Sequence, residues 1–266
     1  MTQTTQLATG LASGTYKVVI TDDKGCISDS IPYFLDQPPV NPILVDIKVY
    51  LQGAYVAAAG LMHDSLRVKH AVDMLTEPYT AMGYAPIAGL GSNSASAPVL
   101  STSGATAPVD WVFVELRDLP TDDYYIAVRH RNHLGAMSVG TSTVTTGTAT
   151  SLDFTNLATT TYGTHAQRIA GGVQMLWGGD ANGDKSVFYT GPLSDANPIF
   201  SKILFAPDNI FFSVSHIVTE YAIEELSMDG AVIYTGPLTE VNVLFLNILL
   251  HPLNTTFRDS HSFSEQ

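Results

Sequence analysis

Oxygen-bearing residues recur at alternate positions in one short stretch of this chain. Asp180, Asn182 and Asp184 supply side-chain oxygens, and Ser186 adds a backbone carbonyl two residues further on. A cation of the size of Ca²⁺ takes about six to eight oxygen ligands at about 2.3–2.6 Å, and alternate residues of a tight loop turn inward together. The spacing therefore predicts a calcium-binding loop.

A second stretch repeats this arrangement 45 residues later, less completely. Its members are Glu225, Ser227, Asp229 and the backbone carbonyl of Ala231. Asp195 and Glu240 then fall at the same offset in the two copies, where we expect the final ligand of each loop. We predict one calcium ion at the first loop, and the second loop as the place of a second ion.

The two copies also share a longer pattern. V-x-Y-T-G-P-L occurs at 187–193 and again at 232–238, and an apolar stretch follows each. These stretches predict short helices, with Asn197 as the N-cap before Pro198 in the first. The residues expected to be buried by the helices are Phe200, Leu204, Phe245 and Leu249.

On these motifs, residues 171–266 resemble a dockerin type I module, a tandem of EF-hand-like loop–helix units. The resemblance implies a structural role for calcium: without it the carboxylates repel one another, and with it they close the loops and hold the helices. It also implies a secreted or cell-surface protein of bacteria.

The region before this duplication, residues 43–170, predicts strands. Strand-like runs occur at 43–51, 109–117 and 124–130, with apolar and polar residues alternating from Val45 onward in the first run and through the other two. Gly- and Ser-rich loops separate these runs, which favours a β-sandwich. On one continuous strand, His130 and His133 would point to opposite faces and share no ligand. We interpret His63 and His70 as part of a solvated helix face. The segments VDIKVYLQGAY, LTEPYTAMGY, VDWVFVELRD and YYIAVRHRNHLGAM resemble a sandwich of secreted bacterial surface proteins.

The N-terminal region, residues 1–37, predicts a small β unit. Strands are expected at 16–21 and 26–31, around a turn at 22–25. The pattern L-x-x-G-T-Y-x-V-x-I-x-D-x-x-G-C, from Leu11 to Cys26, resembles the SprB repeat of surface adhesins, and it implies a packing role for Cys26. Residues 38–42, rich in proline, predict a linker.

Composition limits the classes of function. The 266 residues carry 12 Lys+Arg against 25 Asp+Glu, a net charge of −13, which disfavours nucleic-acid binding and favours cations. No apolar stretch reaches the length of about 18 residues that predicts a membrane span. The first twenty residues show no secretory signal, so we expect a fragment of a longer protein. The chain contains no G-x-S-x-G, HExxH or Cys/His motif, which predicts a protein that is not an enzyme.

Together these features predict a mainly β protein: a partial β repeat, a β-sandwich and a small duplicated α+β module. The expected role is adhesion or presentation at an extracellular surface, with carbohydrate or a surface protein as partner. Two alternatives are an accessory region of a secreted carbohydrate-active enzyme and a dockerin proper that binds a cohesin.

Overall fold

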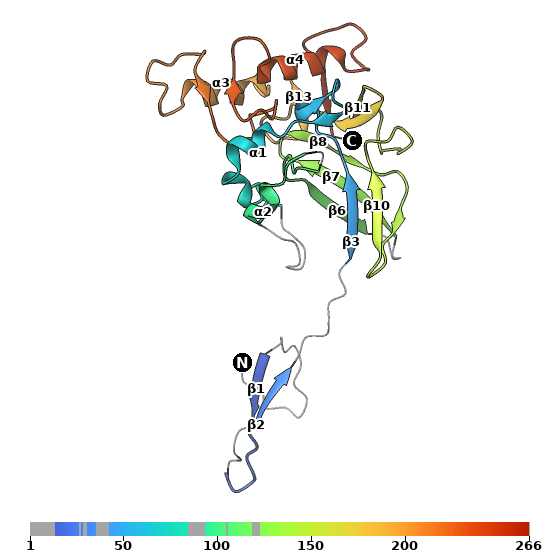
Figure 1. The fold of residues 1–266 in the computed structure, drawn as a ribbon, viewed down its shortest axis with the longest axis vertical. Coiled ribbons are helices and arrows are strands. Elements are labelled where there is room, and N and C mark those ends of the chain that lie inside the picture. Colours follow the sequence, from blue (N-terminus) through green and yellow to red (C-terminus); the bar gives the residue numbers. More distant parts are fainter. Residues whose placement is uncertain are drawn as a thin grey trace. The chain divides into compact units, whose positions relative to one another are not determined.

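The computed structural model describes residues 14–26, 28, 31–35, 43–84, 94–104, 106–118 and 123–265. The predicted linker at 38–42 lies outside these residues. Strands account for 29% of the chain and helices for 16%, so the fold is predominantly β with few helices. Two compact units are present: residues 1–44 with 146–148, and residues 45–145 with 149–266 (Figure 1). None of the helices in the described ranges is long and apolar enough to cross a membrane.

The smaller unit contains one antiparallel pair, β1 (Gly14–Val18) and β2 (Ile31–Leu35). The predicted turn is present: the Asp22 carboxylate accepts the backbone N–H groups of Lys24 (2.9 Å) and Cys26 (2.7 Å). The second strand begins at Ile31, not at Cys26 as predicted, because Cys26 is still held by this turn. Its thiol is exposed, so the expected packing role was wrong.

A four-stranded antiparallel sheet lies at the centre of the larger unit. It consists of β6 (Phe113–Asp118), β7 (Asp123–His130), β8 (His133–Met137) and β9 (Ser142–Thr143), which also pairs with β7. A two-residue turn, Arg131–Asn132, joins β7 to β8 and brings His130 opposite His133. The residues of this turn also contact both copies of the duplicated segment.

Shorter elements surround this sheet. The paired strands are β3 (Leu44–Lys48) with β10 (Ala149–Asp153), β4 (Tyr55–Val56) with β5 (Leu61–Met62), and β11 (Gln167–Ala170) with β12 (Val173–Leu176). The helices are α1 (Ser65–His70), α2 (Ala97–Leu100) and two 3₁₀ turns, η1 (Gln52–Ala54) and η2 (Asp73–Leu75).

The duplicated segment forms two equivalent structures that exchange strands. The first copy contributes β13 (Ser186–Phe188), α3 (Ala196–Leu204) and β14 (Ile217–Val218). The second contributes β15 (Val232–Ile233), α4 (Glu240–Leu250) and β16 (Ser262–Ser264). The first strand of each copy pairs with the last strand of the other: β13 with β16, and β15 with β14, in matching register.

Aromatic contacts follow the same exchange. Tyr189 of the first copy packs on Phe245 of the second, with ring centroids 4.8 Å apart. The equivalent pair, Tyr234 and Phe200, has a centroid distance of 5.1 Å. The copies are therefore related by an approximate two-fold arrangement, and Figure 1 shows their helices gathered at one end of the larger unit.

Both predicted helices form, but they bury a different face. The fully buried apolar side chains are Ile199, Ile203, Leu244 and Ile248. The four residues expected to be buried are partly buried, and two of them, Phe200 and Phe245, form the aromatic contacts between the copies. The other two are Leu204 and Leu249. Asn197 does not cap α3: its side-chain amide donates to the carbonyls of Gly191 (3.1 Å) and Pro192 (3.2 Å) instead.

Two hydrophobic cores extend across residue 170. Met228, from the second copy, packs in the core that also contains Ile126 and Phe154, whereas Leu134 of β8 packs in the core of the copies. The approach is close at Gly53, where an added Cβ would lie 2.0 Å from the Leu226 carbonyl oxygen. The N-terminal and C-terminal parts of this unit thus share packing on both sides of the predicted boundary.

Candidate metal centre

Three carboxylates of the second loop meet in one place. One oxygen from each of Glu225, Asp229 and Glu240 lies within 4.8 Å of the others. Glu225 and Glu240 are fully buried and Asp229 is half-buried. Glu240 is the first residue of α4, and the preceding N-cap, Thr239, accepts a hydrogen bond from Asn242 N–H (3.2 Å). This cap places Glu240 in the first turn of α4, from which its carboxylate reaches back to the second loop.

Hydrogen bonds hold two of these carboxylates in position. Glu240 accepts the backbone N–H of Ile233 (2.6 Å) on one oxygen and the hydroxyl of Ser227 (2.9 Å) on the other. Glu225 accepts the N–H of Gly230 (3.3 Å), and its second oxygen faces the Arg131 guanidinium at 3.3 Å. These hydrogen bonds therefore orient the carboxylate oxygens towards the inside of the loop.

Burial makes ionisation of the same groups costly. It raises the pKa of Glu225 to about 8, against the opposing effect of Arg131, and the pKa of Glu240 to about 7. A divalent cation would offset this cost by favouring the charged forms. The donor set is made of oxygen, and oxygens within 4.8 Å of one another are close enough to share one ion at about 2.4 Å. Glu225, Asp229 and Glu240 could therefore hold a metal ion.

The first loop also binds backbone N–H groups through its carboxylates, but it does not bring three of them to metal-binding distance. The Asp180 carboxylate accepts the N–H groups of Gly183 (2.7 Å), Asp184 (3.1 Å) and Lys185 (2.9 Å). Asp195 accepts those of Ala181 (2.8 Å) and Phe188 (2.7 Å). Within the part of the chain that the structure describes, the second loop supplies the one group of three potential ligands at metal-binding distance. The geometry favours the second loop, whereas the sequence pattern favours the first.

The other predicted residues of the first loop lie on its outside. Asn182 and Asp184 are exposed, and the Asn182 amide donates to the Asp184 carboxylate at 3.1 Å. Asp184 also accepts Ser186 N–H at 2.8 Å. Burial raises the pKa of Asp180 to about 6 and that of Asp195 to about 7. The first loop thus has the same electrostatic cost, although its three carboxylates are spread more widely.

Backbone groups of the second loop are also hydrogen-bonded. Ala231 is buried, and its N–H donates to the Asp229 carboxylate at 2.9 Å. His70 is buried beside this loop, with Nε2 3.1 Å from the Gly230 carbonyl and Nδ1 3.0 Å from Asp73. The interpretation of His70 as part of a solvated face was therefore wrong, because α1 packs against the second copy.

A buried polar network adjoins Glu225. Arg131 Nε lies 3.0 Å from the Asp110 carboxylate, which also contacts His130 Nε2 (3.0 Å) and accepts the Tyr221 hydroxyl (2.6 Å). Burial opposes ionisation of Asp110, but the charge of Arg131 and the hydrogen bonds outweigh it and lower the pKa of Asp110. Arg131 therefore shares its charge between Asp110 and Glu225, so the network supports the second loop.

His130 and His133 face one another, contrary to the sequence prediction. Their Nδ1 atoms are 3.0 Å apart, because the two residues flank the hairpin turn instead of lying on one strand. Burial lowers the pKa of both rings. Since the side chains of His130 and Asp110 have no solvent exposure, this group offers no surface to a substrate. The sequence does contain a signal for this hairpin, because the polar residues Arg131 and Asn132 lie between two strand-like runs of residues.

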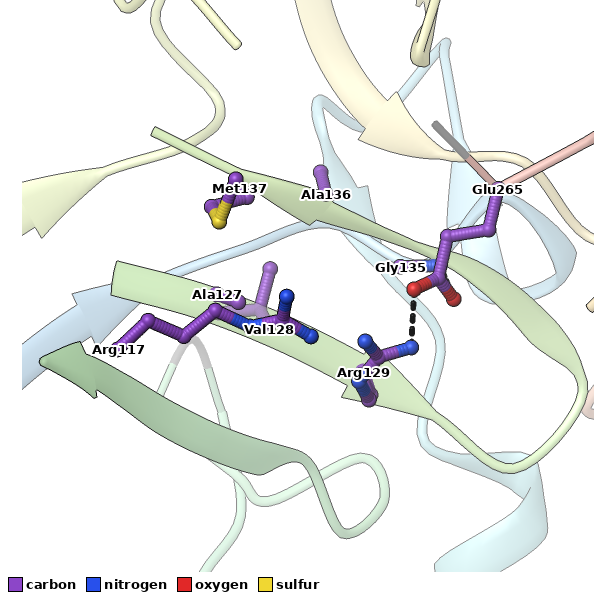
Figure 2. A pocket seen from close by; sticks show the side chains of 8 residues that line it. All are labelled: Arg117, Ala127, Val128, Arg129, Gly135, Ala136, Met137 and Glu265. Carbon is purple, nitrogen blue, oxygen red and sulfur yellow. Dashed lines mark hydrogen bonds and ion pairs between the residues drawn. The ribbon is translucent and has the colours of Figure 1, made fainter. Parts of the chain in front are cut away.

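A small pocket lies on the sheet at a distance in sequence from both loops. Figure 2 shows its lining, and the carboxylate of Glu265 inside it. Glu265 pairs with Arg129 and accepts Gly135 N–H at 3.2 Å, while its own N–H donates to Lys185 O at 2.9 Å. We call Glu265, Arg129 and Gly135 the C-terminal latch. Because Glu265 lines this pocket and bonds to Arg129, Gly135 and Lys185, the latch attaches the end of β16 and the first loop to the sheet.

Comparison of the chain with models of known protein families, with curated proteins and with solved structures found no match. The function proposed below therefore rests on the residues of this chain.

Proposed function

We propose that this chain is a non-enzymatic, calcium-stabilised part of a secreted or cell-surface protein. In this proposal a β-sandwich carries a duplicated, EF-hand-like module, and the module presents or supports a surface used for adhesion. The supporting observation is the convergence of Glu225, Asp229 and Glu240 oxygens within 4.8 Å in a buried loop. Calcium is the preferred cation because the alternating oxygen spacing of both loops suits its size and coordination number.

Calcium would act on stability in this proposal. Buried carboxylates that repel one another favour the unfolded state, and a cation bound only by the folded state shifts the balance back. Glu225 and Glu240 would hold the second ion directly. Asp180, Asp184 and Asp195 would hold an ion at the first loop after a small inward turn of their side chains. In this proposal the adhesive surface keeps its shape only while calcium is bound, so adhesion depends on extracellular calcium.

Calorimetric titration of the metal-free protein with CaCl₂ tests the metal part of this proposal. We expect saturable binding of one or two ions and a higher unfolding temperature in calcium than in chelator. Glu240→Gln should remove one binding event, and Asp208→Asn, an exposed carboxylate outside both loops, should remove none. Absence of binding heat together with an unchanged unfolding temperature would contradict the proposal.

Antibody labelling of intact cells tests the location and role. The proposal expects labelling of unbroken cells and attachment to carbohydrate or protein surfaces that weakens in chelator. Detection only after the cells are broken would contradict a surface role, even if calcium binding holds.

A further inference from the structure

One residue of the β7–β8 turn contacts the start of both candidate loops. The backbone carbonyl of Asn132 accepts the N–H groups of Gly179 (3.1 Å) and Asp180 (3.3 Å). Its side-chain nitrogen donates to the carbonyls of Ile223 (3.0 Å) and Glu225 (2.7 Å). Asn132 is completely buried. The first residue of each loop is thus fixed to the same asparagine, which lies outside the duplicated segment.

The chemistry of this contact requires an amide side chain. The nitrogen of Asn132 donates both of its hydrogens, while its oxygen lies 2.8 Å from His133 Nδ1. Aspartate has no hydrogens to donate at neutral pH, and alanine would leave two buried carbonyls without partners. The neighbouring Arg131 adds a contact to the Glu225 carboxylate at 3.3 Å. The turn therefore positions both the backbone and the side chain of Glu225.

We propose that Asn132 is a positioning residue that couples cation binding at the two loops. This inference rests on the proposed function, since it requires that the loops bind calcium. Because the first residue of each loop is hydrogen-bonded to Asn132, a shift of one loop on cation binding moves this asparagine and with it the first residue of the other loop. Each loop then raises the affinity of the other by the same factor.

Calcium titrations of the full chain measure this factor. Asp184→Asn weakens the first loop at an exposed ligand that does not contact Asn132, and the affinity of the second loop is then compared with that in wild type. We expect it to be lower by about fivefold or more. Glu240→Gln gives the reciprocal measurement on the first loop, which should change by the same factor.

Asn132→Ala should abolish the coupling, so that Asp184→Asn no longer changes the affinity of the second loop. The matched control is Asn209→Ala. Asn209 is also a buried asparagine that donates to two carbonyls, Ile203 (2.8 Å) and Ser213 (2.9 Å), but its bonds lie outside both loops. It should lose stability and retain the coupling.

The outcomes separate the two proposals. A wild-type protein without calcium binding overturns the proposed function. Calcium binding with the same second-loop affinity in wild type and Asp184→Asn overturns the coupling alone. Equal coupling in Asn132→Ala and Asn209→Ala assigns the effect to the exchanged strands and overturns the role of Asn132. If Asn132→Ala does not fold, the reciprocal pair Asp184→Asn and Glu240→Gln still decides whether the loops are coupled.

Discussion

Glu240→Gln is expected to change stability in opposite directions with and without calcium. Glu240 is fully buried at the start of α4, and one of its oxygens belongs to the group it forms with Glu225 and Asp229. Glutamine has nearly the same shape. Its oxygen can accept the Ile233 N–H, and its NH₂ group can donate to the Ser227 hydroxyl oxygen. The substitution therefore removes the charge and retains both hydrogen-bonding neighbours.

The magnitude follows from the burial of this carboxyl. Its pKa rises from 4.5 to about 7, which corresponds to about 3 kcal/mol against the ionised form in the folded protein. Glu225 titrates in the same pH range, and relaxation of the folded protein reduces the cost of ionising Glu240. We therefore expect the free energy of unfolding of the variant to exceed that of wild type by about 1–2 kcal/mol in chelator at pH 8. In excess calcium the sign reverses, because wild type gains about 3 kcal/mol at a hundredfold excess over Kd and the variant loses a ligand.

The dependence on pH has a definite sign. A carboxyl whose folded pKa is raised keeps its proton in the folded state after the unfolded state has lost it. The contribution of these carboxyls to stability in chelator is therefore largest below about pH 4, where the unfolded chain is also protonated, and falls as pH rises towards 8 through the raised pKa values of Asp180, Asp195, Glu225 and Glu240. The free energy of unfolding of Glu240→Gln in chelator should fall less than that of wild type over this pH range.

Urea unfolding followed by tryptophan fluorescence checks these expectations at pH 5.5 and pH 8, each in chelator and in calcium. Asp208→Asn serves as the control, because its carboxylate is exposed and pairs with His216 outside both loops, so each of the four values should change by less than about 1 kcal/mol. An equal loss of stability for Glu240→Gln in all four conditions would refute the reasoning, since it would show that Glu240 acts only as a hydrogen-bond acceptor for the backbone.

Four further substitutions test the packing around the site by urea unfolding. Phe200→Ala and Phe245→Ala remove equivalent half-buried rings, so each should cost about 2 kcal/mol, and a loss in only one would argue against equivalent copies. Asp110→Asn leaves Arg131 with Glu225, at 3.3 Å, as its remaining buried carboxylate partner and should cost about 2–3 kcal/mol; a loss below about 1 kcal/mol would contradict a shared charge. Gly135→Ala would place a Cβ 2.9 Å from Val128 O and 3.0 Å from the latch carboxylate, so we expect a loss of about 1–3 kcal/mol and an unchanged value would contradict the close approach.

Local sequence signals predicted much of the duplicated segment. Both helices form where apolar runs follow Asp195 and Glu240, because the offset and the run are the same in both copies. The buried face was not predictable from either copy alone. It depends on the exchange of β13 and β15 between copies, and strands of two or three residues carry no periodic signal of their own.

The contribution of the hairpin turn could not be predicted from local pattern. Arg131 and Asn132 look like polar turn residues, yet both are buried against segments about 90 residues later in the chain. The preference for the second loop has a similar origin. Position for position the first loop has the better oxygen spacing, and the first and last carboxylates of both loops accept equivalent backbone N–H groups. Glu225 and Glu240 have an extra methylene, however, and their oxygens meet that of Asp229.

The strand exchange has a consequence for the history of the segment. A single copy would leave its first and last strands without partners, and the partner that completes both is another copy of itself. An ancestral gene that encoded one copy would therefore have produced a homodimer, and gene duplication would have turned two associating chains into one. After that fusion the halves were free to diverge, so one loop could retain the better spacing while the other gathered its carboxylates beside the hairpin.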